Sequence, residues 1–484
     1  MKRSIKINTV FNIIKMCSSM VLPLITFPYV SRILQPANVG RVNFSETFVG
    51  YFSLIACLGI STYGIRECAA VRDNKEELER VSSEIFSLNV ITTCLAYVLL
   101  LLTLILGNSS LLVYRTIILI QSSSILFVTL GADWINSAME DFVYITIRTL
   151  IFQIITLCMI FAFVKKPDDY LIYAGISVFA SIGANFVNIF YRKRLCRVRF
   201  TLNINVQKHL PPIMWLFAMS AVQTIFNSAD VTMLGLMKDD YQVGLYTTAH
   251  KVTKIIGQLL ASVGAVMIPQ LSIAFSNNDF GRANGLLKKI LLFNFTIGLP
   301  CIVGILMMAE DIILVVGGPE FSQAAPVLRL LSLSVLFSLV GGNFLGNVVL
   351  IPMKKEKYYM FVCAITAIVN VILNACLIPQ FAAVGASIAT AVNGFLICVL
   401  LLVNVDKNIK IDYIWNTLQK PLMGCVFIVL SCFVCSYIKI DAYRILMKIG
   451  CSVITYGISQ ILFENELVLN TLQSLKNKLM ERKV

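Results

Sequence analysis

Long apolar segments recur along almost the whole chain, and they constrain its fold more than any other feature. Most have about twenty residues or more, the length that an α-helix needs to cross the hydrocarbon core of a bilayer. Short polar segments separate them, so we predict an all-α polytopic membrane protein with about fourteen transmembrane helices. The predicted spans cover residues 8–33, 41–65, 84–106, 113–136, 143–164, 169–191, 211–236, 243–275, 285–308, 324–350, 357–378, 382–403, 419–437 and 443–463.

Composition agrees with a membrane protein and excludes several functions. Hydrophobic residues make up 58% of the chain and charged residues only 14%, whereas soluble proteins have about 25% charged residues. The net charge of +14 is explained by basic loops on one side of a membrane, so we expect no nucleic-acid partner. Fourteen cysteines lack zinc-site spacing, and no ATP-binding loop or protease motif is present. We therefore predict no metal, no cofactor and no enzymatic activity.

The distribution of Lys and Arg predicts the orientation in the membrane. With the N-terminus placed inside, twenty-eight of the forty basic residues lie in inside segments, nine in outside segments and three within spans. Basic residues concentrate on the cytoplasmic side of membrane proteins, so both termini are predicted to be cytoplasmic. The basic N-terminus lacks a cleavage site and is interpreted as the start of a retained first helix.

The longest polar break between apolar segments predicts the domain organisation. It is also the most basic one, and its simplest role is to anchor the protein to anionic lipid. The predicted parts are an N-terminal six-helix lobe (1–191), a basic cytoplasmic linker (192–210), a C-terminal six-helix lobe (211–403), two additional transmembrane helices (404–463) and an amphipathic cytoplasmic tail (464–484).

Two weak internal matches indicate that the lobes are copies of each other. Val39-Gly40 aligns with Val243-Gly244 at an offset of 204 residues, and 180–190 aligns with 386–395 at an offset of 206. Six spans per copy put both copies in the same orientation, related by an axis along the membrane normal. At the first offset, Thr47 and Gly50 correspond to Lys251 and Lys254.

Charged residues within the spans are candidates for binding substrate. Lys251 and Lys254 lie three residues apart on one helix face, and burying a Lys at the centre of a span costs about 2.5–3.5 kcal/mol. They form either a cationic cavity wall for a phosphate or carboxylate, or a pair that snorkels to the interface. Asp230 is either the partner of one of these Lys residues or a proton or cation site. Arg329 lies either in the cavity or at the interface.

Other polar residues have a simpler structural interpretation. Arg32 and Arg41 bracket the connection between the first two spans, where they either contact headgroups or form a gate for an anionic substrate. Asparagines spaced four residues apart often hold neighbouring transmembrane helices together. We predict that role for two such pairs, Asn343 with Asn347 and Asn370 with Asn374.

Four segments carry a resemblance to a known family: FPYVSRILQPANVGRVNF, LIACLGISTYGIRECAAVRD, DVTMLGLMKDDYQVGLYTTAHKV and IVNVILNACLIPQFAAVGASIAT. In these segments the chain resembles the polysaccharide (oligosaccharide) flippase family, which includes the Wzx-type translocases and belongs to the multidrug/oligosaccharidyl-lipid/polysaccharide exporter superfamily. The resemblance covers about the first 400 residues. Gln35 and Ala382 stand where the family usually has Gly, which affects turn geometry more than substrate chemistry.

This resemblance implies a V-shaped, MATE-like fold of two lobes that opens to one side of the membrane at a time. It implies translocation of undecaprenyl-pyrophosphate-linked oligosaccharide across a bacterial cytoplasmic membrane, for O-antigen, capsule or exopolysaccharide. Basic cavity residues hold the pyrophosphate in related flippases, so the positional candidates here are Arg32, Arg66, Lys251 and Lys254. A glycan polymerase and a chain-length regulator are the expected protein partners.

Two other functions are compatible with a chain of this kind. An ion-coupled multidrug exporter of the same superfamily would favour acidic cavity residues, whereas the clearest charges within spans here are two Lys and one Asp. A membrane glycan polymerase or ligase would need a large outer loop with catalytic side chains, and the outside connections are short.

Overall fold

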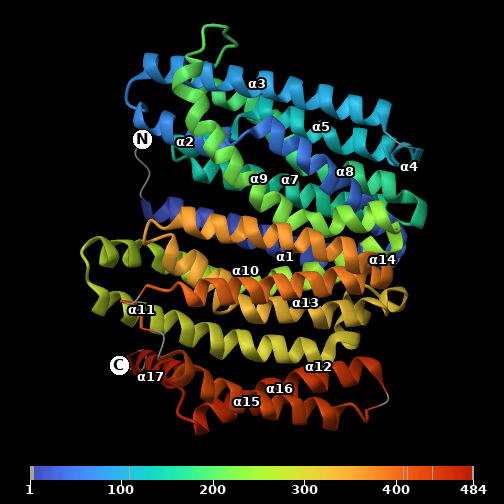
Figure 1. Ribbon diagram of the computed structural model, residues 1–484, viewed down its shortest axis with the longest axis vertical. Helices are drawn as coiled ribbons and strands as arrows, with labels where there is room; N and C mark the ends of the chain where they lie inside the picture. Colours follow the sequence, from blue (N-terminus) through green and yellow to red (C-terminus); the bar gives the residue numbers. More distant parts are fainter. Residues whose placement is uncertain (1–4, 108, 407, 411–412, 439, 482–484) are drawn as a thin grey trace. The chain divides into compact units, whose positions relative to one another are not determined.

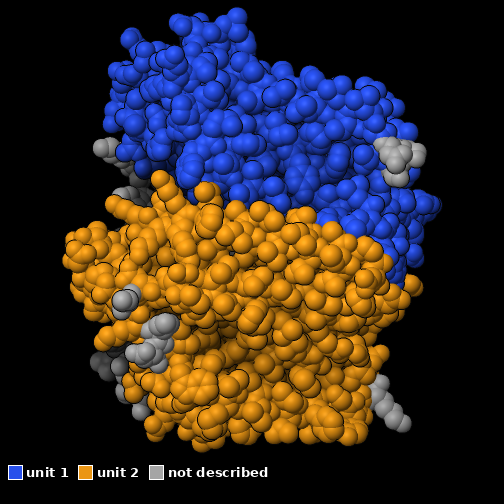
Figure 2. Space-filling model, in the orientation of Figure 1, with its two compact units in different colours: residues 1–244 blue, residues 245–484 orange. Residues whose placement is uncertain are grey.

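Helices account for all the regular structure that the computed structural model describes, namely residues 5–481 without 108, 407, 411–412 and 439 (Figure 1). The chain divides into two compact units, residues 1–244 and 245–484 (Figure 2). Unit 1 contains α1 (Ile5–Cys57), α2 (Ile60–Ala70), α3 (Lys75–Leu106), α4 (Ser109–Leu112), α5 (Arg115–Gly131), α6 (Asp133–Ala138), α7 (Phe142–Phe163), η1 (Pro167–Asp169), α8 (Tyr170–Tyr191), η2 (Arg192–Arg194) and α9 (Val206–Met237).

Helix α10 (Asp240–Ser276) begins in unit 1 and continues into unit 2. Two elements of unit 2, η3 and η5, are π-helices. Unit 2 further contains α11 (Phe280–Phe293), η3 (Asn294–Gly298), α12 (Leu299–Val316), η4 (Pro319–Phe321), α13 (Ala324–Ser338), η5 (Gly341–Leu350), α14 (Glu356–Val403), α15 (Tyr413–Cys435), α16 (Asp441–Leu462) and α17 (Glu466–Glu481).

Ten helices of the described chain are long and apolar enough to cross a membrane. The candidate made of α1 and α2 (Cys17–Ala70) and the candidate α14 each correspond to two predicted spans. Helices α5 and α9 account for the two predicted spans outside that group of ten. Many large apolar side chains along these helices are exposed, among them Leu101, Ile105 and Ile454. Such a surface suits contact with lipid, and the chain is a multi-pass helical membrane protein as predicted.

The kinks in α1 and α14 fall on the two residues that replace glycine. Gln35 has φ 63° and Ala382 has φ 49°, so both lie in the left-handed region that glycine enters without a steric penalty. A side chain in that region costs roughly 1–2 kcal/mol. Both residues thus keep a backbone conformation that glycine favours, and an effect of the two replacements on turn geometry stays a prediction.

Helix packing within each unit follows chain order only in part. In unit 1, α1 packs against α3, α5, α7 and α9, and α2 packs against α6. In unit 2, α14 packs against α13, while α15 and α16 form a pair that contacts α12 (Figure 1). Helix α9 packs with α1 and α2, so the compact unit extends beyond the predicted linker. The predicted division into two six-helix lobes stays a prediction.

Candidate functional site

An ion-pair cluster joins the second half of α1 to the start of α10. The Nε of Arg41 lies 3.0 Å from Oδ2 of Asp240, and the Tyr114 hydroxyl donates a hydrogen bond to Oδ1. The Arg41 guanidinium also lies over the Tyr170 ring, 5.2 Å from its centroid. Asp240 is the first residue of α10, where a carboxylate interacts favourably with the helix dipole. We call these four residues the Arg41 cluster.

Two glycines bring the backbones of α1 and α10 into direct contact beside the Arg41 cluster. A Cβ atom on Gly40 would overlap the carbonyl oxygen of Asp240, and one on Gly244 would overlap the carbonyl oxygen of Pro36. At the offset of 204, Pro36 corresponds to Asp240 and Gly40 to Gly244. The contact is therefore reciprocal, as a two-fold axis between repeated segments requires. We call it the glycine contact, and it supports the sequence alignment of the two copies.

The predicted site residues of unit 1 lie in different environments. Arg32 is exposed on α1, whereas Asp230 on α9 is 5% exposed. Arg66 is exposed on α2, where its Nη2 lies 3.4 Å from Oε1 of Glu67 and its guanidinium lies over the Tyr63 ring. A shared binding role for Arg32, Arg66 and Asp230 stays a prediction.

The predicted cationic residues of unit 2 differ in exposure. Lys251 is half-buried on α10 and Lys254 is exposed on the same helix. Arg329 on α13 donates to Oε1 of the exposed Glu310 at 2.9 Å and to the Leu306 carbonyl at 3.3 Å, which joins α13 to α12. Arg329 therefore has a structural partner, while cavity roles for all three residues stay predictions.

The asparagine pairs also differ. The Asn374 amide donates to Oδ1 of the buried Asn370 at 3.1 Å within α14. Asn343 and Asn347 lie in the π-helix η5, where Asn343 is half-buried and Asn347 is exposed. The predicted role between helices is untested for both pairs.

Sequence reasoning identified Arg41 but missed its partner. Asp240 lies in a polar connection 199 residues away, and nothing local distinguishes it from the neighbouring Asp239. The internal alignment contained the missing signal, because it places Asp240 opposite Pro36, one helical turn before the matched glycines. Tyr114 carries no comparable signal.

The predicted linker lies along the first turns of α3. Backbone N–H groups of Arg197, Arg199 and Thr201 donate to side-chain oxygens of Glu79, Ser83 and Ser87 respectively. Two residues of extended chain advance by about 6.6 Å and four residues of helix by about 6.0 Å, so alternate linker residues match every fourth residue of α3. We call this segment, 197–201, the docked linker.

A buried polar chain continues from the docked linker into the start of α9. His209 Nε2 lies 3.1 Å from Oε2 of Glu84, and His209 Nδ1 lies 2.8 Å from the Tyr63 hydroxyl. Earlier in the linker, Cys196 is buried with its sulfur 3.0 Å from the Ser82 hydroxyl, and burial raises the pKa of its thiol. These contacts fix the linker to α2, α3 and α9.

A second buried ion-pair cluster lies in unit 2. Asp311 on α12 accepts from Nη2 of Arg444 at 2.9 Å and from Nζ of Lys448 at 2.7 Å, and both cations belong to α16. Asp311 and Lys448 are almost completely buried. We call these three residues the Asp311 cluster, and it holds the last helix pair against α12. Among the residues described, no group of three or more His, Cys, Asp or Glu side chains is placed to bind a metal ion.

The fold is that of known helical transporters. A solved structure of the lipid II flippase MurJ covers 95% of this chain and 100% of its own, with a TM-score of 0.77 and 17% identity. An inward-facing MATE family multidrug transporter of the MOP superfamily covers 81% of this chain and 97% of its own, with a TM-score of 0.61 and 12% identity. These similarities show that the chain has the polytopic helical fold of these two transporters.

The family follows from the sequence itself. The pattern of the family described as "Polysaccharide biosynthesis protein" matches residues 5–275, more than half of the chain, and the chain belongs to that family. The MatE pattern matches residues 216–376. A "Putative O-antigen transporter" of Escherichia coli K12 is 23% identical over 84% of this chain and 98% of its own. The capsular polysaccharide biosynthesis protein CapF of Staphylococcus aureus is 23% identical over 78% and 92%.

Proposed function

We propose that this protein flips lipid-linked oligosaccharide units across a membrane. Membership of the polysaccharide biosynthesis family over residues 5–275 carries the proposal. Relatives along nearly their whole length are named for O-antigen transport and capsule biosynthesis, and the similar MurJ structure is that of a lipid II flippase. Transport of this kind requires binding and release but no covalent chemistry.

The finer proposal concerns the substrate and the side of the membrane. The substrate is an undecaprenyl-pyrophosphate-linked repeat unit taken from the cytoplasmic leaflet of a bacterial inner membrane, and both termini are cytoplasmic. The asymmetry of Lys and Arg supports this orientation. The translocated unit then passes to a glycan polymerase and a chain-length regulator.

Binding of the pyrophosphate is assigned to basic side chains of α10. Lys251 and Lys254 lie on one face of that helix, and a cation near bilayer depth attracts a phosphate more strongly than in water. We propose that Arg32 and Arg66 contact the pyrophosphate before or after it binds at α10, because both side chains are exposed. Separation of α1 from α10 at the Arg41 cluster and the glycine contact would accompany opening by alternating access.

The double substitution Lys251→Gln with Lys254→Gln tests the binding role. We expect lipid-linked oligosaccharide to accumulate on the cytoplasmic face and its appearance on the outer face to fall at least ten-fold. Arg282→Gln with Lys289→Gln is the matched control, because it removes two exposed cations from α11 of the same unit. Normal translocation by a normally expressed Lys251/Lys254 variant would exclude these residues from substrate binding.

A second candidate is export of cationic drugs coupled to an ion gradient. The MatE match to residues 216–376 and the MATE transporter fold favour it. Efflux of a lipophilic cationic dye from cells, with no movement of lipid-linked oligosaccharide, would establish this function instead.

A further inference from the structure

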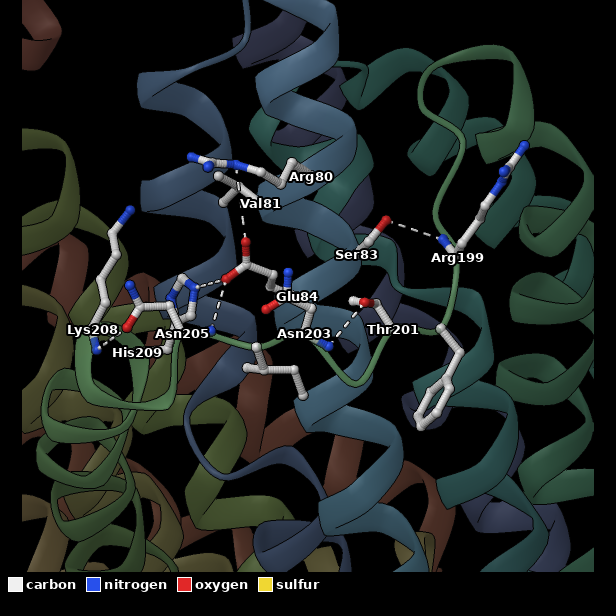
Figure 3. A pocket seen from close by; sticks show the side chains of 12 residues that line it. Arg80, Val81, Ser83, Glu84, Arg199, Thr201, Asn203, Asn205, Lys208 and His209 are labelled. Carbon is white, nitrogen blue, oxygen red and sulfur yellow. Dashed lines mark hydrogen bonds and ion pairs between the residues drawn. The ribbon is translucent and has the colours of Figure 1, made fainter.

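A cavity of about 680 Å³ lies between α3, the docked linker and the start of α9 (Figure 3). Three cationic side chains line it, from Arg80, Arg199 and Lys208, and Glu84 is its one carboxylate. In Figure 3, Arg199 and Lys208 lie at two edges of the cavity with Glu84 between them. The walls thus come from segments more than a hundred residues apart in the sequence.

The Glu84 carboxylate already has hydrogen-bond and ion-pair partners within the protein. Oε2 of Glu84 accepts from the Asn205 backbone N–H at 3.1 Å and lies 3.1 Å from His209 Nε2, while Oε1 lies 4.0 Å from Arg80 Nε. Arg80 also pairs with Glu77 at 2.9 Å. The structure gives Arg199 and Lys208 no carboxylate partner among the described residues, so the cavity has an excess of positive charge.

The linker wall of this cavity is held in place before any ligand arrives. Regularly spaced backbone hydrogen bonds attach the docked linker to α3, and the buried His209 fixes the start of α9. A site with such walls binds without first ordering its own backbone, which lowers the entropic cost of binding.

Apolar side chains beside the cavity indicate where the ligand comes from. Phe200 is 53% exposed and Leu202 is 82% exposed, although both belong to the basic linker. A segment at the headgroup boundary presents apolar residues next to basic ones favourably, because acyl chains cover the first and headgroups pair with the second. Basic pockets at that level bind anionic headgroups.

We propose that this cavity binds the phosphate of an anionic phospholipid of the cytoplasmic leaflet, with Arg199 and Lys208 contacting the phosphate and Phe200 and Leu202 contacting the acyl region. This lipid is distinct from the transported substrate, and the proposal holds for any substrate. Through the docked linker and Glu84, the bound lipid stabilises the arrangement of α2, α3 and α9.

The test measures lipid binding to the purified full-length protein in detergent. Short-chain phosphatidylglycerol, short-chain phosphatidylcholine and inorganic phosphate are titrated in parallel. We expect preference for phosphatidylglycerol, and a loss of at least ten-fold in its affinity for Arg199→Gln with Lys208→Gln, since each basic residue near an anionic surface contributes about 1 kcal/mol. The matched control is Lys193→Gln with Arg194→Gln, two linker cations that do not line the cavity.

Three results would overturn the proposal. Equal loss in the two double variants would show that general linker charge binds the lipid. Equal binding of inorganic phosphate and phosphatidylglycerol would assign the cavity to a soluble anion. If Phe200→Ser with Leu202→Ser leaves the affinity for phosphatidylglycerol unchanged, these two side chains do not contact the acyl region. A thermal unfolding midpoint equal to that of the unmodified protein in each variant excludes misfolding as the cause.

Discussion

The Arg41 cluster and the Asp311 cluster each place one aspartate against basic residues, yet they differ in burial and in what they join. In the Arg41 cluster the Arg41 and Asp240 side chains are 29% and 13% exposed. In the Asp311 cluster the Lys448 and Asp311 side chains are 8% and 5% exposed, and a second cation, Arg444, contacts the same carboxylate. The first joins α1 to the start of α10, and the second joins α12 to α16.

This difference separates a contact that can open from one that cannot. A partly exposed ion pair can exchange its partner for water at a lower cost than a fully buried one. A buried pair that loses one partner leaves an uncompensated charge, which is strongly unfavourable. We infer that the Asp311 cluster anchors the last helix pair permanently, whereas the Arg41 cluster holds one state of a moving contact.

Asp311→Asn should have the largest effect. It leaves Lys448 buried without its carboxylate, and breaking a buried pair in this way costs about 3–5 kcal/mol. We expect little folded protein, measured by size-exclusion profile and thermal unfolding in detergent. The double variant Asp311→Leu with Lys448→Met should recover most of the loss, because Arg444 retains Asp441 at 2.8 Å. Full stability of Asp311→Asn alone would show that the cluster is not an anchor.

Gly40→Ala should have the second-largest effect, because the added methyl group would overlap the Asp240 carbonyl. Overpacking typically costs about 1–3 kcal/mol, here only in the state that contains the glycine contact. Translocation should fall several-fold while the protein remains folded, and Gly244→Ala should act in the same way. Gly50→Ala is the control on the same helix, since a Cβ there would meet nothing within 4 Å. Equal activity of Gly40→Ala and Gly50→Ala would contradict a role for the contact in transport.

Arg41→Gln should have the smallest effect on stability. Water reaches this ion pair more easily than the Asp311 cluster, so the unfolding midpoint should fall less than in Asp311→Asn. The translocation rate should change measurably, because the balance between closed and open states shifts by a comparable amount. Exchanging the charges with Arg41→Asp and Asp240→Arg should return the rate toward that of the unmodified protein. A loss of folded protein as large as that of Asp311→Asn would remove the distinction between the two clusters.

The sequence predicted local properties well and non-local ones poorly. Hydrophobic length located the spans, and Gln35 and Ala382, which stand in place of glycine, have the positive φ that glycine favours. The partnership of Arg41 with Asp240 could not be found locally, because a carboxylate in a loop has no signal for a distant helix. The Asp311 cluster was missed because Arg444 and Lys448 were interpreted as loop-side basic residues.

At the candidate site, too, some features could be predicted from the sequence and others could not. The alignment at an offset of 204 anticipated that Gly40 and Gly244 are equivalent, and the structure adds that they form a reciprocal contact. The pair Asn343 and Asn347 lies in a π-helix, which the sequence pattern did not predict. Pattern reasoning assumes the common helix type, so a change of type is invisible to it.

Reconstitution in lipid vesicles measures the proposed translocation itself. Purified protein in vesicles is supplied with a fluorescent undecaprenyl-pyrophosphate oligosaccharide, and a membrane-impermeant quencher reports its movement between leaflets. We predict protein-dependent movement that Lys251→Gln with Lys254→Gln strongly slows and that Arg282→Gln with Lys289→Gln does not. If the substrate moves no faster with the unmodified protein than in protein-free vesicles, the protein does not flip this lipid-linked oligosaccharide.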